Sequence, residues 1–260
     1  MTDPDTLARH LDEAACHARP VPQSPPGQSL TPEAAYDVQQ RLVARRLARG
    51  ETAVGIKLGL TSRAKMEQVG VREVIVGRLT DAMQMEEGGT IALDRLIHPR
   101  IEPEIAFLLA RPLPPDPTLP QAMACLDGLA AAVEIIDSRY QGFRFDLGDV
   151  IADNASSAGF ILGPWHPPAT DVANLGIVLS VSGQLRETGS SAAILGHPLR
   201  ALVAAARIAA ARGIATQPGE IVLAGAATAA IPLAPGDAFL AEFSRLGRIR
   251  TTARRAAEAG

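Results

Sequence analysis

The chain has 260 residues, of which 47% are hydrophobic and 20% are charged, so it is long enough to fold around a substantial core. Its 25 Lys and Arg residues nearly balance 28 Asp and Glu residues, which gives no electrostatic reason to expect nucleic acid or an anionic membrane as a partner. The N-terminus lacks the apolar segment of a signal peptide, and no apolar run approaches the roughly 20 residues that span a bilayer. Composition therefore favours a soluble, cytoplasmic protein.

The first 52 residues are predicted to form a small helical cap with a linker. Residues 4–18 carry leucines and alanines at helical spacing, and a segment rich in Pro and Ser follows them. Thr31 and Pro32 form an N-cap and a first-turn proline, so a second helix is expected from there to Gly50. We therefore divide the chain into a cap and linker, residues 1–52, and a main domain, residues 53–260.

The main domain is predicted to contain short strands separated by glycine-rich turns. The strands alternate with turns rather than with helices, which favours a mixed or mainly antiparallel β core and hence an α+β fold. Helices are expected at 61–70, 121–132 and 192–213, the last being rich in alanine. The expected strands cover residues 53–60, 74–85, 97–109, 133–140, 158–165, 175–185, 221–230 and 237–255.

The central strand, IHPRIEPEIAFLL at residues 97–109, carries two glutamates in an otherwise apolar run. Glu102 and Glu104 are two residues apart, so both leave the same face of a strand, about 7 Å apart along the backbone. Two neighbouring carboxylates repel, and burying them is costly unless a cation or a shared proton compensates. A metal ion would explain the pair, although an edge strand with one solvated face would give the same pattern.

A second acidic element, VEIIDSR, supplies Glu134 and Asp137. They are three residues apart and point to opposite faces of a regular strand, so one of them is expected to join the glutamate pair. We favour Glu134, because it lies in the apolar part of the strand, whereas Asp137 lies where a loop can solvate it. Three carboxylates without a cysteine match Mg²⁺ or Mn²⁺ better than zinc, and His98, which precedes Pro99, is interpreted as structural.

Lys57 lies between Ile56 and Leu58 in a strand bounded by glycines. It is either an edge residue whose amine reaches solvent or a buried amine that would hold or transfer protons near the carboxylates. The motifs of P-loop proteins, dinucleotide-binding folds, serine hydrolases and HExxH metalloproteases are absent from the sequence. Cys16 and Cys125 belong to no CxxC pattern, so neither a zinc knuckle nor a disulfide framework is expected.

Five ordered motifs resemble the fumarylacetoacetate hydrolase superfamily: GIKLGLTSRAKMEQVGV, GRLTDAM, IHPRIEPEIAF, VEIIDSRYQGFRF and DVIADNASSAGFILG. They are similar to the branch that holds 2-oxopent-4-enoate hydratases and 2-oxo-3-hexenedioate (4-oxalocrotonate) decarboxylases. The resemblance covers roughly residues 30–245, and the stretches GLTSRAKMEQ and SRYQGFRF favour the decarboxylases. It implies a mixed β-roll core of the fumarylacetoacetate hydrolase type with flanking helices, a Mg²⁺ or Mn²⁺ cofactor, and a small 2-oxo acid substrate.

The resemblance also implies a role for individual residues. Glu102, Glu104 and Glu134 match the metal ligands of the family. Lys57 matches its active-site lysine, Asp81 its TD aspartate and Ser156 a serine of its ADNxS turn, which gives three catalytic candidates.

For substrate binding we select Arg139, Asp153 and Thr228. Arg139 or Arg144 is a candidate for the distal carboxylate of the substrate, although either could be a surface arginine, and turn chemistry alone would explain Asp153. The stretches GAATAA and FSRLGRIR depart from the family patterns GGxTxA and FxxLGxxS, and the departure falls on the substrate contacts around Gly225 and Thr228.

The resemblance therefore implies a metal-dependent carboxy-lyase of aromatic meta-cleavage degradation that decarboxylates 2-oxo-3-hexenedioate to 2-hydroxypenta-2,4-dienoate. Two alternatives stay open: a hydratase or C–C bond hydrolase of the same family, and a non-catalytic member that kept the fold. The resemblance implies a complex with a paired hydratase, because the decarboxylation product is labile. A homo-oligomer is also expected.

Overall fold

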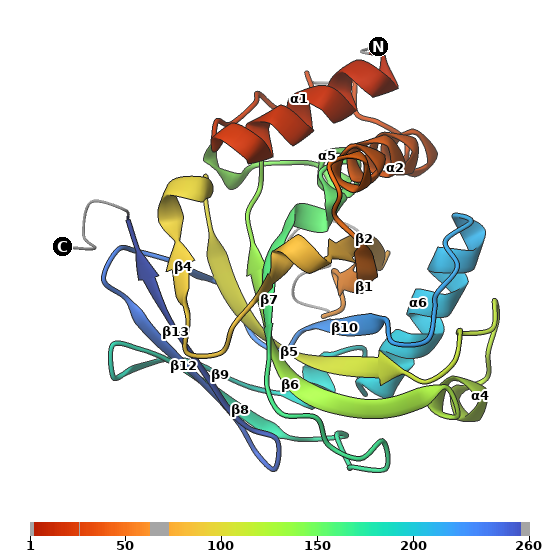
Figure 1. Ribbon diagram of the computed structural model, residues 1–260, viewed down its shortest axis with the longest axis vertical. Coiled ribbons are helices and arrows are strands. Elements are labelled where there is room, and N and C mark those ends of the chain that lie inside the picture. Colours follow the sequence, from red (N-terminus) through yellow and green to blue (C-terminus); the bar gives the residue numbers. More distant parts are fainter. Residues whose placement is uncertain (1–2, 26, 63–72, 256–260) are drawn as a thin grey trace.

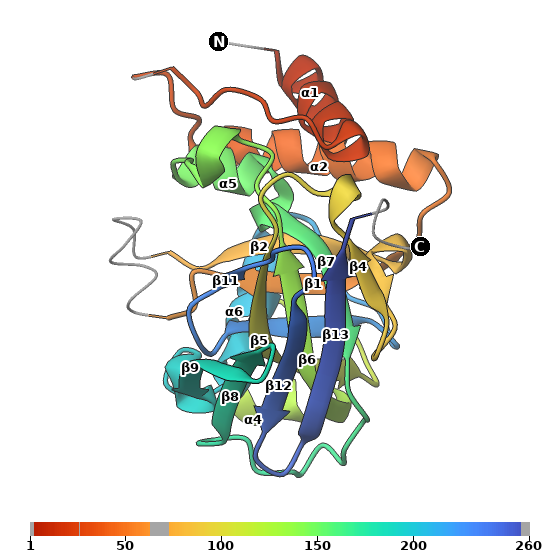
Figure 2. The ribbon, with the colours of Figure 1, turned by 90° about the vertical axis from the view of Figure 1, so that its left-hand side faces the viewer.

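The computed structural model describes residues 3–25, 27–62 and 73–255. The two predicted N-terminal helices are confirmed as α1 (Pro4–His17) and α2 (Pro32–Ala48). The side chains of Asp3 and Thr31 cap them by accepting hydrogen bonds from backbone N–H groups of the first turn. Both helices gather with α5 (Leu147–Ala152) at one end of the sheets (Figure 1 and Figure 2). The short helix predicted at residues 61–70 lies mostly outside the described residues.

The body of the protein consists of two sheets. The larger has the spatial order β2-β1-β10-β5-β6-β7-β3, with β11 paired to β5, and the smaller has the order β4-β13-β12-β8-β9. The pairs β1–β10, β3–β7 and β13–β4 are parallel and the others are antiparallel, which confirms the mixed, mainly antiparallel core. The strands are β1 (Ala53–Gly59), β2 (Ile75–Thr80), β3 (Gln84–Met85), β4 (Thr90–Ala92), β5 (Arg100–Leu109), β6 (Leu126–Ile136), β7 (Ser157–Leu162), β8 (Gly176–Val181), β9 (Gln184–Ser190), β10 (Ile221–Ala226), β11 (Ile231–Pro232), β12 (Ala238–Phe243) and β13 (Gly247–Arg254).

Strand β5 separates the core from the candidate site. Its side chains alternate between two faces, and Ile101, Ile105 and Phe107 pack in the main hydrophobic cluster together with residues of the smaller sheet. Glu102 and Glu104 leave the opposite face. The strand is strongly bent (Figure 1), so this second face lies inside the curl of the larger sheet. The two glutamates are therefore held by a strand whose other face is anchored in the core.

The predicted helix at residues 121–132 was wrong in its second half. The helix α4 covers only Leu119–Met123, and the chain from Leu126 onward belongs to β6. Strand β6 is paired on both sides, with β5 and β7, and its alanines are completely buried. Pairing on two sides outweighs the intrinsic preference of alanine for a helix.

The alanine-rich helix predicted at residues 192–213 is also shorter than expected. Helix α6 covers Leu199–Ala211, and the preceding residues Leu195 and Gly196 have positive φ angles that a right-handed helix does not contain. Pro198 further disfavours a helical conformation at the residue before it. The segment before α6 is therefore a 3-10 turn at Ser191–Ala193 followed by an irregular connection, rather than part of the helix.

No helix in the described ranges is both long enough and apolar enough to cross a membrane. Helices α1 and α2 share a hydrophobic cluster with Tyr140 and Ile151 of the main domain. The division of the chain between residues 52 and 53 stays a prediction.

Candidate metal centre and active site

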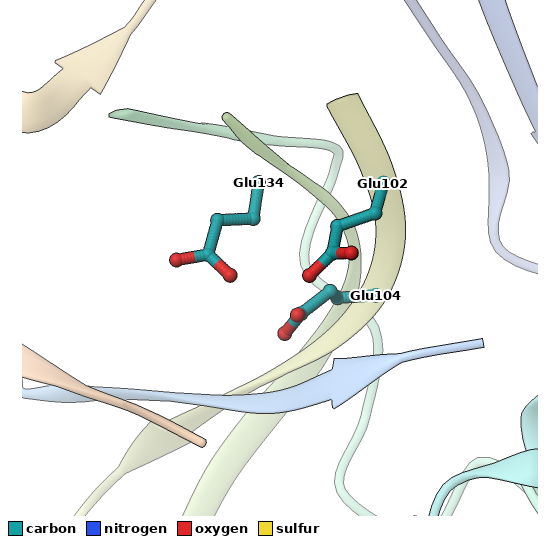
Figure 3. A group of neighbouring side chains, drawn as sticks. All are labelled: Glu102, Glu104 and Glu134. Atoms are coloured by element: carbon teal, nitrogen blue, oxygen red, sulfur yellow. The ribbon is translucent and has the colours of Figure 1, made fainter. Parts of the chain in front are cut away.

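Three buried carboxylates converge inside the curl of the larger sheet. Glu102 and Glu104 project from β5, and Glu134 lies on β6 directly opposite Glu102 in the strand register. One oxygen from each carboxylate lies within 4.8 Å of the other two, and Figure 3 shows the three side chains turning toward a shared space. Their exposed fractions are 4%, 0% and 0%. The edge-strand explanation is therefore wrong, because the face that carries the glutamates is buried.

The negative charge of Glu104 is only partly compensated by the groups around it. One carboxylate oxygen accepts a hydrogen bond of 2.8 Å from the Gly225 N–H, whereas Oε1 is buried without a hydrogen-bond partner among the described residues. Burial, and then repulsion by Glu134 and Glu102, raises the pKa of Glu104 well above its usual range. A buried oxygen without a partner and a destabilised charge are features that a divalent cation would satisfy.

Lys57 extends from β1 into the same cluster and is 2% exposed. Its Nζ lies 3.0 Å from Glu134 Oε2 and donates a hydrogen bond of 3.0 Å to the Ala155 carbonyl oxygen. Burial alone would lower the pKa of Lys57, but attraction by Glu134, Glu104 and Glu102 outweighs it and raises the pKa. Of the two interpretations left open by the sequence, the structure confirms the buried amine.

The turn that receives Lys57 has an uncommon backbone conformation. Asn154, Ala155 and Ser156 have φ angles of 52°, 52° and 56°, in the left-handed region that residues other than glycine rarely adopt. The Asn154 side chain fixes the turn to β2, since its Oδ1 accepts from the Arg78 N–H at 2.7 Å and its Nδ2 donates to the Arg78 carbonyl at 2.9 Å. The strained turn thus aims the Ala155 carbonyl at Lys57 and presents the buried Ser156 hydroxyl beside it.

A cavity of about 440 Å³ opens beside Lys57 and Glu102. The catalytic candidate Ser156 and the substrate-binding candidate Thr228 both line it, and the Ser156 Oγ has no hydrogen-bond partner among the described residues. The cavity combines a few charged and polar side chains with apolar walls, as is usual for a site that binds a small molecule. Its lining is Lys57, Gly59, Leu60, Ser62, Ile75, Arg100, Glu102, Ile136, Phe143, Phe145, Val150, Ala155, Ser156, Ala193, Ala227, Thr228, Ala229 and Ala230.

Asp81, predicted to be catalytic, does not line this cavity. It is exposed, and its Oδ1 accepts hydrogen bonds from the backbone N–H groups of Thr52 and Ala82, at 2.9 and 2.8 Å. The hydrogen bond from Thr52 is the largest of the effects that lower the pKa of Asp81. Asp81 therefore fixes the junction before β1 and the turn after β2, outside the cavity that Lys57 and Glu102 line.

The structure also separates two of the predicted substrate-binding residues from the cavity. Arg139 and Asp153 are buried and paired with each other, and the Arg139 N–H further donates to Asp153 Oδ2 at 3.0 Å. Burial raises the pKa of Asp153 to about 6, although the Arg139 guanidinium opposes this rise. Neither residue lines the cavity, and neither does the exposed Arg144. The Arg139–Asp153 pair therefore holds the loop after β6 against the turn at residues 153–156.

Asp137 and His98 lie where the sequence placed them, outside the carboxylate cluster. The Asp137 carboxylate accepts hydrogen bonds from the backbone N–H groups of Ile97 and His98, so it fixes the chain that leads into β5. The imidazole of His98 is not among the groups that converge on the glutamates. Glu134 is consequently the third acid of the cluster, as predicted.

Among the lining residues that were not predicted to be functional, one arginine and two phenylalanines are notable for their side chains. Arg100 is two residues before Glu102 on the same face of β5, a spacing that could have indicated a shared site. Phe143 and Phe145 come from the SRYQGFRF stretch, whose aromatic character the sequence shows but whose position in the fold it does not. The Arg100 guanidinium carbon lies 4.1 Å from the Phe143 ring centroid.

The chain matches the fumarylacetoacetate (FAA) hydrolase C-terminal family over residues 80–254, a range that contains all three converging glutamates. The chain belongs to this family. It is 52% identical over 243 residues to a 4-oxalocrotonate decarboxylase from Pseudomonas sp, covering 94% of this chain and 95% of the relative. It is 35% identical over 251 residues to a 2-keto-4-pentenoate hydratase from Paraburkholderia xenovorans (strain LB400), covering 95% and 93%.

A solved structure of this family has the same fold across almost the whole chain. The 4-oxalocrotonate decarboxylase from Pseudomonas putida G7, complexed with magnesium and adipate, superposes with a TM-score of 0.91 at 38% identity and covers 96% of this chain and 97% of its own. The resemblance and the mixed α+β fold with N-terminal helices, as predicted from the sequence, are thereby confirmed.

Proposed function

We propose that this family member catalyses the metal-dependent decarboxylation of 2-oxo-3-hexenedioate (4-oxalocrotonate) to 2-hydroxypenta-2,4-dienoate. The observation that carries the proposal is the cluster of three buried glutamates, with Lys57 beside it, at the wall of a cavity of about 440 Å³. The decarboxylase from Pseudomonas sp, at 52% identity, supports this substrate over that of the hydratase relative at 35%.

Glu102, Glu104 and Glu134 would hold Mg²⁺ or Mn²⁺, since hard oxygen donors suit these ions and the buried Glu104 Oε1 has no hydrogen-bond partner in the part of the chain that the structure describes. When bound, the ion supplies Lewis acidity that draws electrons toward the ketone of a 2-oxo acid. The magnesium complex of the related decarboxylase supports this choice of ion. The chain itself supplies the carboxylates, their rigid placement on paired strands, and a site that excludes bulk water.

The reaction breaks the bond between C5 and C6 of the substrate, and the C6 carboxylate leaves as neutral CO₂. The electron pair moves through the conjugated alkene to the ketone oxygen, so one proton must be added there to give the dienol. Lys57 is placed to hold that proton, because its ammonium lies at the cavity wall and is kept charged by the neighbouring glutamates. The Ser156 hydroxyl is available to donate a hydrogen bond to the substrate, and Thr228 borders the same space.

The wider setting of the reaction is part of the proposal. We place it in the meta-cleavage degradation of aromatic compounds, in the cytoplasm, where the free thiols of Cys16 and Cys125 are compatible with a reducing compartment. A complex with a hydratase that consumes the labile dienol, and a homo-oligomeric state, are proposed for the same chain. The cap of residues 1–52 and the catalytic domain of residues 53–260 are proposed as its two structural units.

The test is to measure CO₂ release from 2-oxo-3-hexenedioate with Mg²⁺, with Mn²⁺, and after chelation of the metal. Release that depends on the metal is the expected result. The same preparation is assayed for hydration of 2-hydroxypenta-2,4-dienoate. Hydration without CO₂ release would replace the decarboxylase proposal by the hydratase alternative, and inactivity in both assays would favour a non-catalytic member of the family.

A further inference from the structure

The cavity contains two cations among its described lining residues, Lys57 and Arg100. Lys57 is paired with Glu134, as described above. Arg100 forms no ion pair with any carboxylate in the described parts of the chain, and its guanidinium instead lies against the ring of Phe143, another lining residue. The Phe143 ring meets Phe145 edge to face, with 5.3 Å between their centroids. Arg100 is thus a cation that is held at the cavity by aromatic side chains and is available to an anion.

The spacing of Arg100 and Glu102 along β5 is comparable to the length of a six-carbon diacid. Arg100 and Glu102 lie on one face of β5, two residues and therefore about 7 Å apart along the backbone. An extended six-carbon chain has five carbon–carbon bonds of about 1.5 Å, so its two carboxylate carbons are about 6 Å apart. A substrate whose 2-oxo acid end lies at the glutamate cluster would place its other carboxylate near Arg100.

Apart from Lys57 and Arg100, the described residues of the cavity wall offer the distal carboxylate no cation. Ile136, Phe143, Phe145 and Val150 are apolar, and a carboxylate placed against them without a cation would lose its hydration without compensation. The two arginines first considered for this role are excluded, since Arg139 is paired with Asp153 and neither it nor Arg144 lines the cavity.

We infer that Arg100, supported by the Phe143 ring, binds the distal carboxylate of the substrate. This contact makes the site selective for dicarboxylic over monocarboxylic 2-oxo acids. The inference rests on the proposed function for the identity of the substrate. Arg100 acts in binding rather than in the chemical step. The carboxylate that it holds becomes neutral CO₂, so the attraction weakens as the bond breaks and stabilises the bound substrate more than the transition state.

The kinetic test uses Arg100→Gln, which removes the charge and keeps a hydrogen-bonding side chain. The expected result is a KM for 2-oxo-3-hexenedioate raised about 10- to 100-fold, as for the loss of a charged hydrogen-bonded contact, with kcat within about threefold of the unmodified protein. Arg100→Lys should recover part of the affinity, because it restores the charge without the planar guanidinium. Arg144→Gln removes a neighbouring exposed arginine and should change neither parameter. A fall in kcat at unchanged KM would overturn the inference.

A binding test separates this inference from the proposed activity. Adipate and hexanoate have the same six carbons but two and one carboxylates, and calorimetry measures their affinities for the Mg²⁺-loaded protein. The unmodified protein should prefer adipate, and Arg100→Gln should lose that preference while hexanoate binds as before. If no CO₂ is released yet this preference depends on Arg100, the decarboxylase proposal fails and the inference stands. A preference that survives in Arg100→Gln, or its absence from the unmodified protein, would overturn the inference.

Discussion

Lys57→Met would remove the single cation that the described structure places among three buried glutamates, while preserving the length and bulk of the side chain. The Lys57 Nζ lies 3.0 Å from Glu134 Oε2, and both side chains are almost completely buried, at 3% and 0% exposure. Removing one member of such a pair leaves a buried uncompensated charge, which costs about 3–5 kcal/mol of stability. The Ala155 carbonyl also loses its donor. We expect a loss of this size in the metal-free protein.

The loss should depend on pH and on metal. Without Lys57 the pKa of Glu104, already raised by burial, rises further. A carboxyl whose folded-state pKa is raised contributes stability at low pH and loses it as the pH rises through that pKa. The deficit of Lys57→Met should therefore be larger at about pH 8 than at about pH 5. Mg²⁺ should reverse most of it, because the ion supplies the missing positive charge.

Urea unfolding with and without Mg²⁺, at both pH values, measures these differences, and CO₂ release measures turnover. Loss of the proton held by Lys57 should lower kcat about 10²- to 10⁴-fold even when metal is bound. Arg207→Met is the matched control, because the Arg207–Asp116 pair is exposed and such pairs contribute at most about 1 kcal/mol. A Lys57→Met protein as stable as its parent without metal, and with unchanged kcat, would refute the account of the site.

Glu104→Gln keeps the shape of the side chain but removes its charge. It should abolish turnover and weaken Mg²⁺ binding by more than about 100-fold, with the circular dichroism spectrum unchanged. Full activity in this variant would contradict the assignment of Glu104 as a metal ligand. Because the pKa of Glu104 is raised in the metal-free protein, Mg²⁺ binding should release protons and tighten as the pH rises. Calorimetry in two buffers of different ionisation enthalpy measures the release, and pH-independent affinity would show that no ligand is protonated. Asp81→Asn alters an exposed side chain outside the cavity and should leave kcat/KM within about twofold, whereas a loss of 100-fold or more would restore Asp81 to the catalytic group.

The cluster of three carboxylates was predictable because it follows from residue spacing and local polarity. The two-residue spacing of Glu102 and Glu104 places them on one face of any strand, and a third carboxylate in an apolar run needs the same compensation. The sequence could not show that Arg139 is engaged inside the protein, since that depends on the pairing of Arg139 with Asp153 in the fold. Local turn chemistry had offered a plain explanation for Asp153, and in the structure Asp153 indeed has a structural partner.

The misplaced elements have a similar cause. Alanine-rich segments carry a strong local preference for helix, but the segment that became the second half of the predicted helix at residues 121–132 pairs with β5 and β7. Such pairing joins residues far apart in the chain and leaves little trace in the local pattern. The position of Asp81 was misjudged for a similar reason: its TD motif is local, but the structure shows that it hydrogen-bonds to the backbone of Thr52, which is 29 residues away in the chain.

The left-handed turn at Asn154–Ser156 lowers the stability of the fold while it orients a group at the proposed active site. Each such residue other than glycine or asparagine is held about 1–2 kcal/mol above its relaxed conformation, so glycine at Ala155 would be expected to make the protein more robust. The same change would loosen the carbonyl that orients the Lys57 ammonium. Variants selected for thermal stability alone are therefore expected to relax this turn and to lose turnover.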